Sequence, residues 1–301
     1  MEEKYIKQVS LLVKCLPIIA SEKCFAIKGG TAINLFKCDL PRLSVDIDLV
    51  YLPIEDRETT HLKIHKALSR ISDKLNKLGL SVHSNAKAEE KLVCSDGISE
   101  IKIEPNYTKR GFIYEPKVME LCSKAQDLFG YAQMRIISDG ELWGGKICAA
   151  LDRQHPRDLF DIHNLMNTTG MTAEIKNGFI AFLMSSNRPL HEMLAPHFQL
   201  KEDIFYHEFV GMTDENFTFE EAKQTFDDLV QAVNQALTDD DKELLLNFVE
   251  LKADLANSSI PNLDKLPSIK WKMQNLTALQ TKNQQKFMEQ SVKLREVFFK
   301  A

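Results

Sequence analysis

Two aspartates alternate with apolar residues in one short segment of the chain, and this pattern constrains the fold more than any other. Asp46 and Asp48 lie between Ser44 and Tyr51, and the residues beside and between them are valine, isoleucine and leucine. Alternation of period two predicts a β-strand, in which side chains two residues apart point to the same face. We therefore expect both carboxylates on one face and the apolar residues in a core.

Two carboxylates at this spacing repel each other unless a cation lies between them. Mg²⁺ prefers oxygen ligands and often uses one or two carboxylates together with substrate phosphates. The pattern therefore indicates either a divalent-metal site at Asp46 and Asp48 or a solvated edge strand with two surface acids. Spacing alone does not separate these alternatives.

A glycine pair precedes the acidic segment. Gly29 and Gly30 follow the apolar run 24–27 and precede a short segment, Thr31 to Phe36, with the character of a helix. Glycine lets a backbone approach a ligand closely, and the N-terminus of a helix attracts anions. Main-chain contacts at Gly29, Gly30 and Thr31 are therefore candidates for holding a triphosphate, and an ordinary tight turn is the alternative.

Two sequence blocks resemble the AbiEii-type toxins, which belong to the DNA polymerase β-like nucleotidyltransferase superfamily. The blocks span about the first half of the chain, and their order is more specific than either block alone. The first comprises Lys28-Gly29-Gly30-Thr31-Ala32 and Arg42-x-Ser44-x-Asp46-Ile47-Asp48-Leu49, and the second comprises Lys146-Ile147-Cys148-Ala149-Ala150-Leu151-x-Arg153 and Arg157-Asp158-Leu159-Phe160-Asp161-Ile162.

The superfamily usually supplies a third carboxylate from a later strand, and Glu104 is the candidate here. The segment from Ser99 to Glu104 alternates between isoleucine and charged residues, and Pro105 is expected to end that strand. A carboxylate at this point would complete a two-metal site. Glu100 is the second candidate on the same face, and a plain surface position is the alternative for Glu104.

The second block lies on two predicted helices. Ser138 and Glu141 have the spacing of a capping box, which predicts a helix from about residue 139 to the loop at His155-Pro156. Gly144 and Gly145 inside it each cost about 1 kcal/mol relative to alanine, which indicates close backbone packing. Proline favours the first turn of a helix, so a second helix is expected from residue 157 to 166.

The resemblance implies that Lys146 is a phosphate-binding or catalytic residue and that Asp158 orients it or the substrate. An ammonium near the phosphates would offset the charge that develops as pyrophosphate leaves. The alternatives are a solvated helix lysine and an aspartate that is stabilised by the helix dipole.

Composition agrees with an enzyme of this class. The 301-residue chain is 44% hydrophobic, and its net charge of −5 argues against a broadly basic nucleic-acid surface. No apolar run approaches the roughly 20 residues of a membrane span, and the charged N-terminus does not resemble a signal peptide. The six cysteines form no Cys-x-x-Cys pair, which argues against zinc and favours reduced thiols in the cytoplasm.

The expected fold is α+β, with a polymerase β-like nucleotidyltransferase domain, a mixed sheet flanked by helices, at residues 1–135. A helical domain at residues 136–301 would contribute Lys146 and Asp158 to the site. Capped helices are expected to begin near Thr218 and Thr238. Strands are expected at 24–28, 44–51, 80–83, 91–94, 99–104 and 111–114, a long helix at 59–79, and one basic helix at about 269–299 with Lys300 beyond it.

The function implied by the resemblance is a Mg²⁺-dependent nucleotidyltransferase toxin of a bacterial toxin–antitoxin or phage-abortive-infection system, with a cognate antitoxin encoded nearby. It would transfer NMP from an NTP to an acceptor, with the 3′ end of tRNA as the leading one, using two Mg²⁺ ions, or Mn²⁺ in their place. The residues expected to bind the nucleotide are Lys28, Gly29, Gly30, Thr31, Arg42 and Ser44. Transfer to a protein or a small molecule such as an antibiotic, and a non-catalytic nucleotide-binding module, remain the alternatives.

Overall fold

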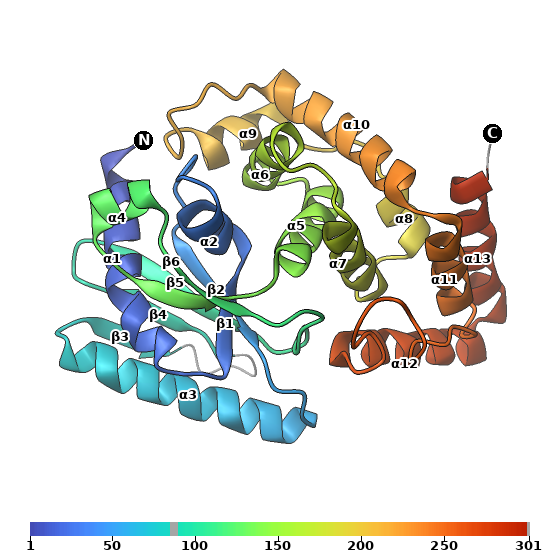
Figure 1. The fold of residues 1–301 in the computed structure, drawn as a ribbon, viewed down its shortest axis with the longest axis horizontal. Coiled ribbons are helices and arrows are strands. Elements are labelled where there is room, and N and C mark those ends of the chain that lie inside the picture. Colours follow the sequence, from blue (N-terminus) through green and yellow to red (C-terminus); the bar gives the residue numbers. More distant parts are fainter. Residues whose placement is uncertain (85–89, 300–301) are drawn as a thin grey trace. The chain divides into compact units, whose positions relative to one another are not determined.

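The computed structural model describes residues 1–84 and 90–299, which divide into two units (Figure 1). The first unit comprises Met1–Ser138 together with Phe209–Asn216. The second comprises Asp139–Glu208 and the chain from Phe217 onwards. The sheet belongs to the first unit and the second is helical, so the chain is α+β, as the sequence predicted.

The described strands of the first unit form one mixed sheet in the order β3-β4-β5-β2-β1-β7-β6. The central strand β2 pairs parallel with β5 and antiparallel with β1. The strands are β1 (Phe25–Lys28), β2 (Asp46–Tyr51), β3 (Ser81–Ser84), β4 (Leu92–Ser95), β5 (Glu100–Asn106), β6 (Lys117–Glu120) and β7 (Gln133–Ile136).

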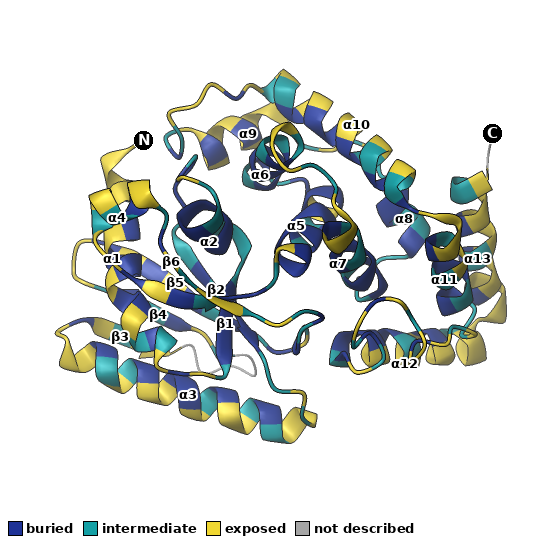
Figure 2. Cartoon of the chain, viewed as in Figure 1, coloured by how far each residue is buried: buried dark blue, intermediate teal, exposed yellow. Residues whose placement is uncertain are grey.

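The alternation in β2 and β5 separates a core face from an open face. Ile47 and Ile103 are fully buried, whereas the charged residues beside them are exposed or half-buried. Helix α1 covers the core face, because Cys15 of α1 lies 3.8 Å from Cys94 of β4, sulfur to sulfur. The buried residues of α1 and α3 complete this layer, and Figure 2 shows that each of these helices has buried and exposed residues along its length. The helices of this unit are α1 (Glu3–Ala20), α2 (Gly29–Ala32), the π-helix η1 (Ile33–Lys37), α3 (Arg57–Lys77) and α4 (Ser123–Phe129).

Three predictions about the strands were wrong. The segment 111–114 is not a strand, and β6 and β7 lie further along the chain. Strand β2 begins at Asp46 rather than at Ser44. Pro105 does not end β5, which continues to Asn106. Strand β4 pairs with β5 only as far as Ile103, so the missing N–H of the proline interrupts no ladder on that side.

The second unit is built from helices whose starts follow the predicted caps. Pro156 occupies the first turn of α6, and Thr218 and Thr238 form capping boxes at α10 and α11. The helices are α5 (Asp139–Arg153), α6 (Pro156–Asn167), α7 (Ala173–Met184), α8 (Leu190–Leu194), α9 (Glu202–Phe209, whose last residue belongs to the first unit), α10 (Phe219–Ala236), α11 (Asp239–Val249), α12 (Pro267–Lys282) and α13 (Gln284–Phe299).

Helices α5 and α7 pack backbone against backbone. A Cβ atom at Gly144 would lie 2.3 Å from the carbonyl carbon of Gly178, and one at Gly178 would lie 1.8 Å from the carbonyl oxygen of Gly140. No side chain fits at such distances, so packing requires glycine at position 144, as its helix-weakening cost indicated. A Cβ at Gly145 would instead meet the Phe182 ring at 3.1 Å.

The predicted single helix at 269–299 is interrupted. Asn283 leaves the helical conformation between α12 and α13, and its side chain accepts a hydrogen bond from the Lys286 N–H at 2.9 Å. Asparagine is a preferred N-cap, so it ends one helix and starts the next. Lys300 lies outside the described residues. Among the described helices, none has both the length and the apolar character that crossing a membrane requires.

Candidate active site

The parallel pairing of β2 with β5 brings three carboxylates onto the open face of the sheet. Glu104 lies directly across from Asp48, and Asp46, two residues earlier, lies across from Lys102. Residues paired in this way point to the same face. The side chains of Asp48 and Glu104 are 37% and 29% exposed, which leaves them accessible to a ligand. Glu100 begins β5 and pairs with Ser95 of β4, away from Asp48.

Lysines from neighbouring strands flank these carboxylates. The Nζ of Lys28, which pairs with Asp48 across β1 and β2, lies 3.7 Å from the Asp48 Oδ1. Lys91, directly before β4, donates a hydrogen bond to the Glu104 Oε1 at 2.8 Å. These ammonium groups offset part of the negative charge that adjacent carboxylates concentrate.

The donor set on this face suits a divalent cation, because Mg²⁺ and Mn²⁺ favour carboxylate oxygens. Within the part of the chain that the structure describes, however, no three His, Cys, Asp or Glu side chains already surround a common point. Asp48 and Glu104 are directed toward lysines instead. Binding a cation would therefore exchange an ammonium for the metal at these two carboxylates.

The glycine pair is packed against the acidic strand. Gly29 has a φ of +72°, which favours glycine, and a Cβ there would lie 2.6 Å from the Asp48 Oδ2. A Cβ at Gly30 would lie 2.7 Å from a guanidinium nitrogen of Arg42 and 2.9 Å from the Ser44 hydroxyl. Side chains at either position would therefore displace residues of the candidate site.

A buried network ties the glycine turn to the start of β2. The Thr31 hydroxyl donates to the carbonyl oxygen of Asp46 at 2.6 Å and lies 3.0 Å from the Ser44 hydroxyl. Arg42 is 2% exposed and donates to the carbonyl oxygen of Leu43. Thr31 and Arg42 thus fix the backbone of the site, and their direct contact with a nucleotide stays a prediction.

Asn34 belongs to this network and the sequence analysis missed it. Its amide donates to the carbonyl oxygen of Gly30 at 2.9 Å, and the residue is fully buried. The signal was an asparagine within the short apolar segment that follows the glycine pair.

In the second unit, Lys146 and Asp158 meet in a buried ion cluster. The Lys146 Nζ lies 2.7 Å from the Asp158 Oδ1 and 2.9 Å from the Asp161 Oδ2. The Arg153 Nε donates to the second Asp158 oxygen at 2.7 Å. Lys146 is 7% exposed, so the alternative of a solvated helix lysine was wrong.

Burial alone would raise the pKa of Asp158, but Lys146 and Arg153 outweigh it and hold that pKa well below its usual range. Asp161 shares the Lys146 ammonium and was not assigned a role from the sequence. The sequence feature that could have indicated a role for Asp161 is its three-residue spacing from Asp158, which places both on one helix face. The cluster holds the Lys146 ammonium in one place.

His155 caps the helix that carries Asp158. Its Nδ1 accepts the backbone N–H of Arg157 at 3.2 Å, so the ring must present a lone pair to the N-terminus of α6. Burial, reinforced by the nearby charge of Arg157, lowers the pKa of His155 to about 4. The ring is therefore neutral at neutral pH and keeps its capping hydrogen bond.

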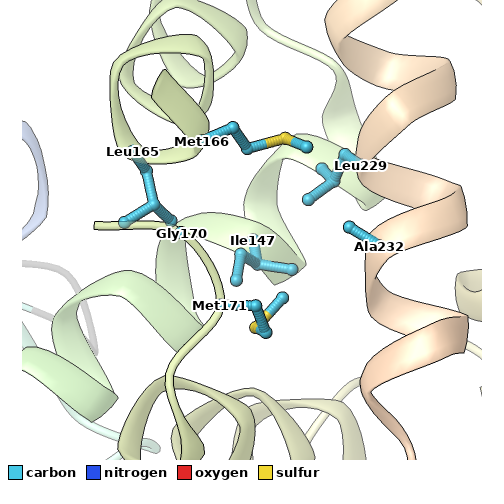
Figure 3. A pocket seen from close by; sticks show the side chains of 7 residues that line it. All are labelled: Ile147, Leu165, Met166, Gly170, Met171, Leu229 and Ala232. Carbon is cyan, nitrogen blue, oxygen red and sulfur yellow. The ribbon is translucent and has the colours of Figure 1, made fainter. Parts of the chain in front are cut away.

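A pocket in the second unit has a different character. Figure 3 shows side chains of α5, α6, α10 and the segment after α6 converging on it, and none carries a charge. Such a lining offers neither the carboxylate oxygens that Mg²⁺ prefers nor a charged group for a phosphate. The pocket is lined by Ile147, Leu165, Met166, Gly170, Met171, Leu229 and Ala232.

These sites lie within one extended family match. The model of the nucleotidyl transferase AbiEii toxin, type IV toxin–antitoxin system, matches residues 10–275. The chain belongs to the AbiEii family. It is therefore a nucleotidyltransferase toxin of a toxin–antitoxin system, and it has an NTP substrate and an antitoxin, as the resemblance in the sequence predicted. No curated protein was found to match this AbiEii toxin.

Solved structures with a similar fold include the nucleotidyltransferase toxin MenT4 from Mycobacterium tuberculosis H37Rv. The superposition has a TM-score of 0.60, covers 79% of this chain and 87% of that chain, and involves 13% sequence identity. At that identity the likeness concerns the fold, which confirms the predicted nucleotidyltransferase fold class.

Proposed function

We propose that this AbiEii toxin transfers a nucleoside monophosphate from an NTP to the 3′ end of tRNA. The observation that carries the proposal is the parallel register of β2 and β5, which sets Glu104 across from Asp48 and on the same face as Asp46. Accessible carboxylates on adjacent strands are what nucleotidyl transfer requires to hold divalent cations. The choice of tRNA rests on the resemblance to the family.

In the proposed reaction, the 3′-hydroxyl oxygen of the acceptor attacks the α-phosphorus of the NTP. A new P–O bond forms as the bond between the α-phosphorus and the β-phosphate oxygen breaks, pyrophosphate leaves, and the hydroxyl proton passes to solvent. Asp46, Asp48 and Glu104 would hold two Mg²⁺ ions, or Mn²⁺, which supply charge stabilisation to the phosphates and activate the hydroxyl.

The triphosphate would lie on the β1 side of the carboxylates. Gly29 and Gly30 place the backbone there directly beside the Asp48 carboxylate, the Arg42 guanidinium and the Ser44 hydroxyl, where a larger residue would not fit. Lys28 lies beside Asp48 and can move from that carboxylate to a phosphate. Ser44 is the remaining residue proposed to contact the phosphates. The buried residues Thr31 and Arg42 would hold Ser44 and the glycine pair in position.

The roles of Lys146 and Asp158 in this reaction stay predictions. The same holds for the assignment of residues 136–301 as a domain that contributes these two residues to the site. Support for a defined role is the ion cluster itself, because two aspartates fix the ammonium of Lys146. Lys146→Arg keeps a positive charge, so a variant that remains folded and loses transfer would support a role in the reaction.

Incubation with each labelled NTP, with total RNA and total protein as separate acceptors, tests the proposal. We expect Mg²⁺-dependent label on tRNA with the wild type and none with Asp48→Ala. Expression of the wild type should arrest growth, and Asp48→Ala should relieve the arrest. Label on protein alone would show that the acceptor is a protein and not tRNA. Normal transfer by Asp48→Ala would refute the assigned metal site.

A further inference from the structure

The open face of the sheet continues beyond the carboxylates, across β5, β4 and β3. Lys102 of β5 pairs with Val93 of β4, which in turn pairs with His83 of β3, so the three side chains form one row. Lys102 and His83 are exposed and Val93 is half-buried.

Lys102 lies directly across from Asp46 but has no hydrogen bond or ion pair with any residue that the structure describes. Lys91 lies one row further along and donates to Glu104. Two ammonium groups therefore stand on the β4–β5 side of the carboxylates, one of them without a counterion among the described residues.

The geometry of nucleotidyl transfer assigns a substrate to this side. The attacking oxygen and the leaving oxygen lie roughly in line through the phosphorus, on opposite sides of it. The leaving pyrophosphate belongs with Gly29 and Lys28 on the β1 side of the carboxylates. The acceptor hydroxyl must then approach from the β4–β5 side, over Lys91 and Lys102.

We propose that Lys91, Lys102 and His83, here named the acceptor face, bind the sugar–phosphate backbone of the acceptor RNA strand. This inference rests on the proposed transfer to RNA and adds the surface that recognises it. Lysines bind phosphates as point charges and carry no base specificity, which suits a strand held by its backbone. Glu100, an exposed acidic residue at the start of β5, would repel a phosphate and therefore bounds the acceptor face on that side.

The composition of the face favours RNA over a protein acceptor. Protein partners are anchored mainly by aromatic and apolar side chains that enter pockets, and the row offers only Val93. The ammonium groups of Lys91 and Lys102 instead complement a polyanion. Because the chain as a whole carries a net charge of −5, a polyanion such as RNA must be attracted by a local basic surface.

Lys102→Gln tests the acceptor face alone, because Lys102 contacts none of the three proposed metal ligands, whereas Lys91 contacts Glu104. The double variant Lys91→Gln/Lys102→Gln should give the larger effect on RNA binding. Lys117 of β6 is the matched control, since it is an exposed strand lysine at the other edge of the same sheet. Each protein is compared by anisotropy of labelled tRNA without NTP, at several salt concentrations, and by KM for tRNA and for NTP.

We expect the double variant to bind tRNA about tenfold more weakly and Lys102→Gln several-fold more weakly. Each lost phosphate contact should reduce the salt slope by about 0.7, as for a single strand. The KM for NTP and the thermal midpoint of Lys102→Gln should match those of Lys117→Gln. Unchanged tRNA binding by the double variant, or a rise confined to the KM for NTP, would overturn the inference.

The wild-type labelling experiment separates this inference from the proposed function. Label on tRNA with the wild type and unaltered tRNA binding by the lysine variants would reject the acceptor face alone. Label on protein only would reject the RNA acceptor, and the acceptor face with it. Label on tRNA with weakened binding by both lysine variants supports both.

Discussion

Each unit pairs lysines with carboxylates, but the two pairings differ in burial. In the first unit, Asp48 is 37% exposed and its Oδ1 lies 3.7 Å from the Lys28 ammonium. In the second unit, Asp158 is 1% exposed and lies 2.7 Å from Lys146, with Arg153 on its other oxygen. The first arrangement is open to exchange with a ligand, and the second is closed around its own charges.

The difference teaches that burial, rather than the presence of an ion pair, separates a carboxylate that can exchange its partner for a ligand from one that is held by its own protein partners. Exposed pairs contribute little to stability, so Asp48 can give up Lys28 for a metal at little cost. A buried pair that loses one partner leaves a charge in a medium of low dielectric. Lys146 and Asp158 are therefore held together, and each variant below probes one side of this contrast.

The largest effect is expected at the open site. Asp48→Asn should lower the rate of NMP transfer about 1,000-fold or more, because under the proposed function it removes a metal ligand on which charge stabilisation depends. The free energy of unfolding should change by less than about 1 kcal/mol, as expected for an exposed group. Labelled-NTP transfer and urea unfolding measure the two quantities, and a large loss of stability would contradict the contrast.

Lys146→Met probes the closed site. It removes the ammonium shared by Asp158 and Asp161, which should cost about 3–5 kcal/mol of unfolding free energy. Lys28→Met, the matched change in the open pair, should cost about 1 kcal/mol or less. Urea denaturation of both variants provides the measurement, and equal costs would show that burial does not distinguish the two pairs.

Glycines extend the comparison. Gly144→Ala places a Cβ 2.3 Å from backbone of α7, so the helices must separate, at a cost of about 3 kcal/mol. Gly29→Ala meets the movable end of Asp48 instead, and it should cost about 1–2 kcal/mol while impairing transfer by displacing that carboxylate. Thermal unfolding together with NTP transfer tests the pair, and a stability loss at Gly29 that exceeds the loss at Gly144 would reverse the expectation.

The smallest effect concerns pH. The pKa of His155 is about 4 in the folded chain, below the value of 6.5 expected on unfolding. Because the unfolded chain binds the proton more tightly, the stability contribution is present above pH 6.5 and is lost as pH falls toward 4. His155→Asn keeps a capping side chain but does not titrate in this range. It should therefore remove up to about 2 kcal/mol of pH dependence between pH 6.5 and 4.

Local physics made much of this predictable. The alternation of apolar and charged residues in β2 and β5 gave the faces of both strands, because a period of two is a property of the extended backbone. The caps at Pro156 and Thr218 gave helix starts for the same local reason. The cost of glycine inside a helix indicated the close contact at Gly144.

The rest depended on contacts between distant segments. Strand order is such a property, and the segment 111–114 shows that local β character does not by itself find a sheet partner. The burial of Lys146 and the part of Asp161 likewise follow from the packing of α5 with α6, which no single segment encodes. Lys91 and Lys102 became informative only when register placed them beside the carboxylates.

The register of β2 and β5 also has an evolutionary consequence. Sliding β5 by one residue would turn Glu104 into the core and Ile101 and Ile103 into water, so the apolar side chains penalise the slip. Residues that never meet a substrate thereby keep the acidic face aligned. A change in length at the turn 96–99 before β5, rather than any loss of chemistry, would be one route by which a lineage disarms this toxin.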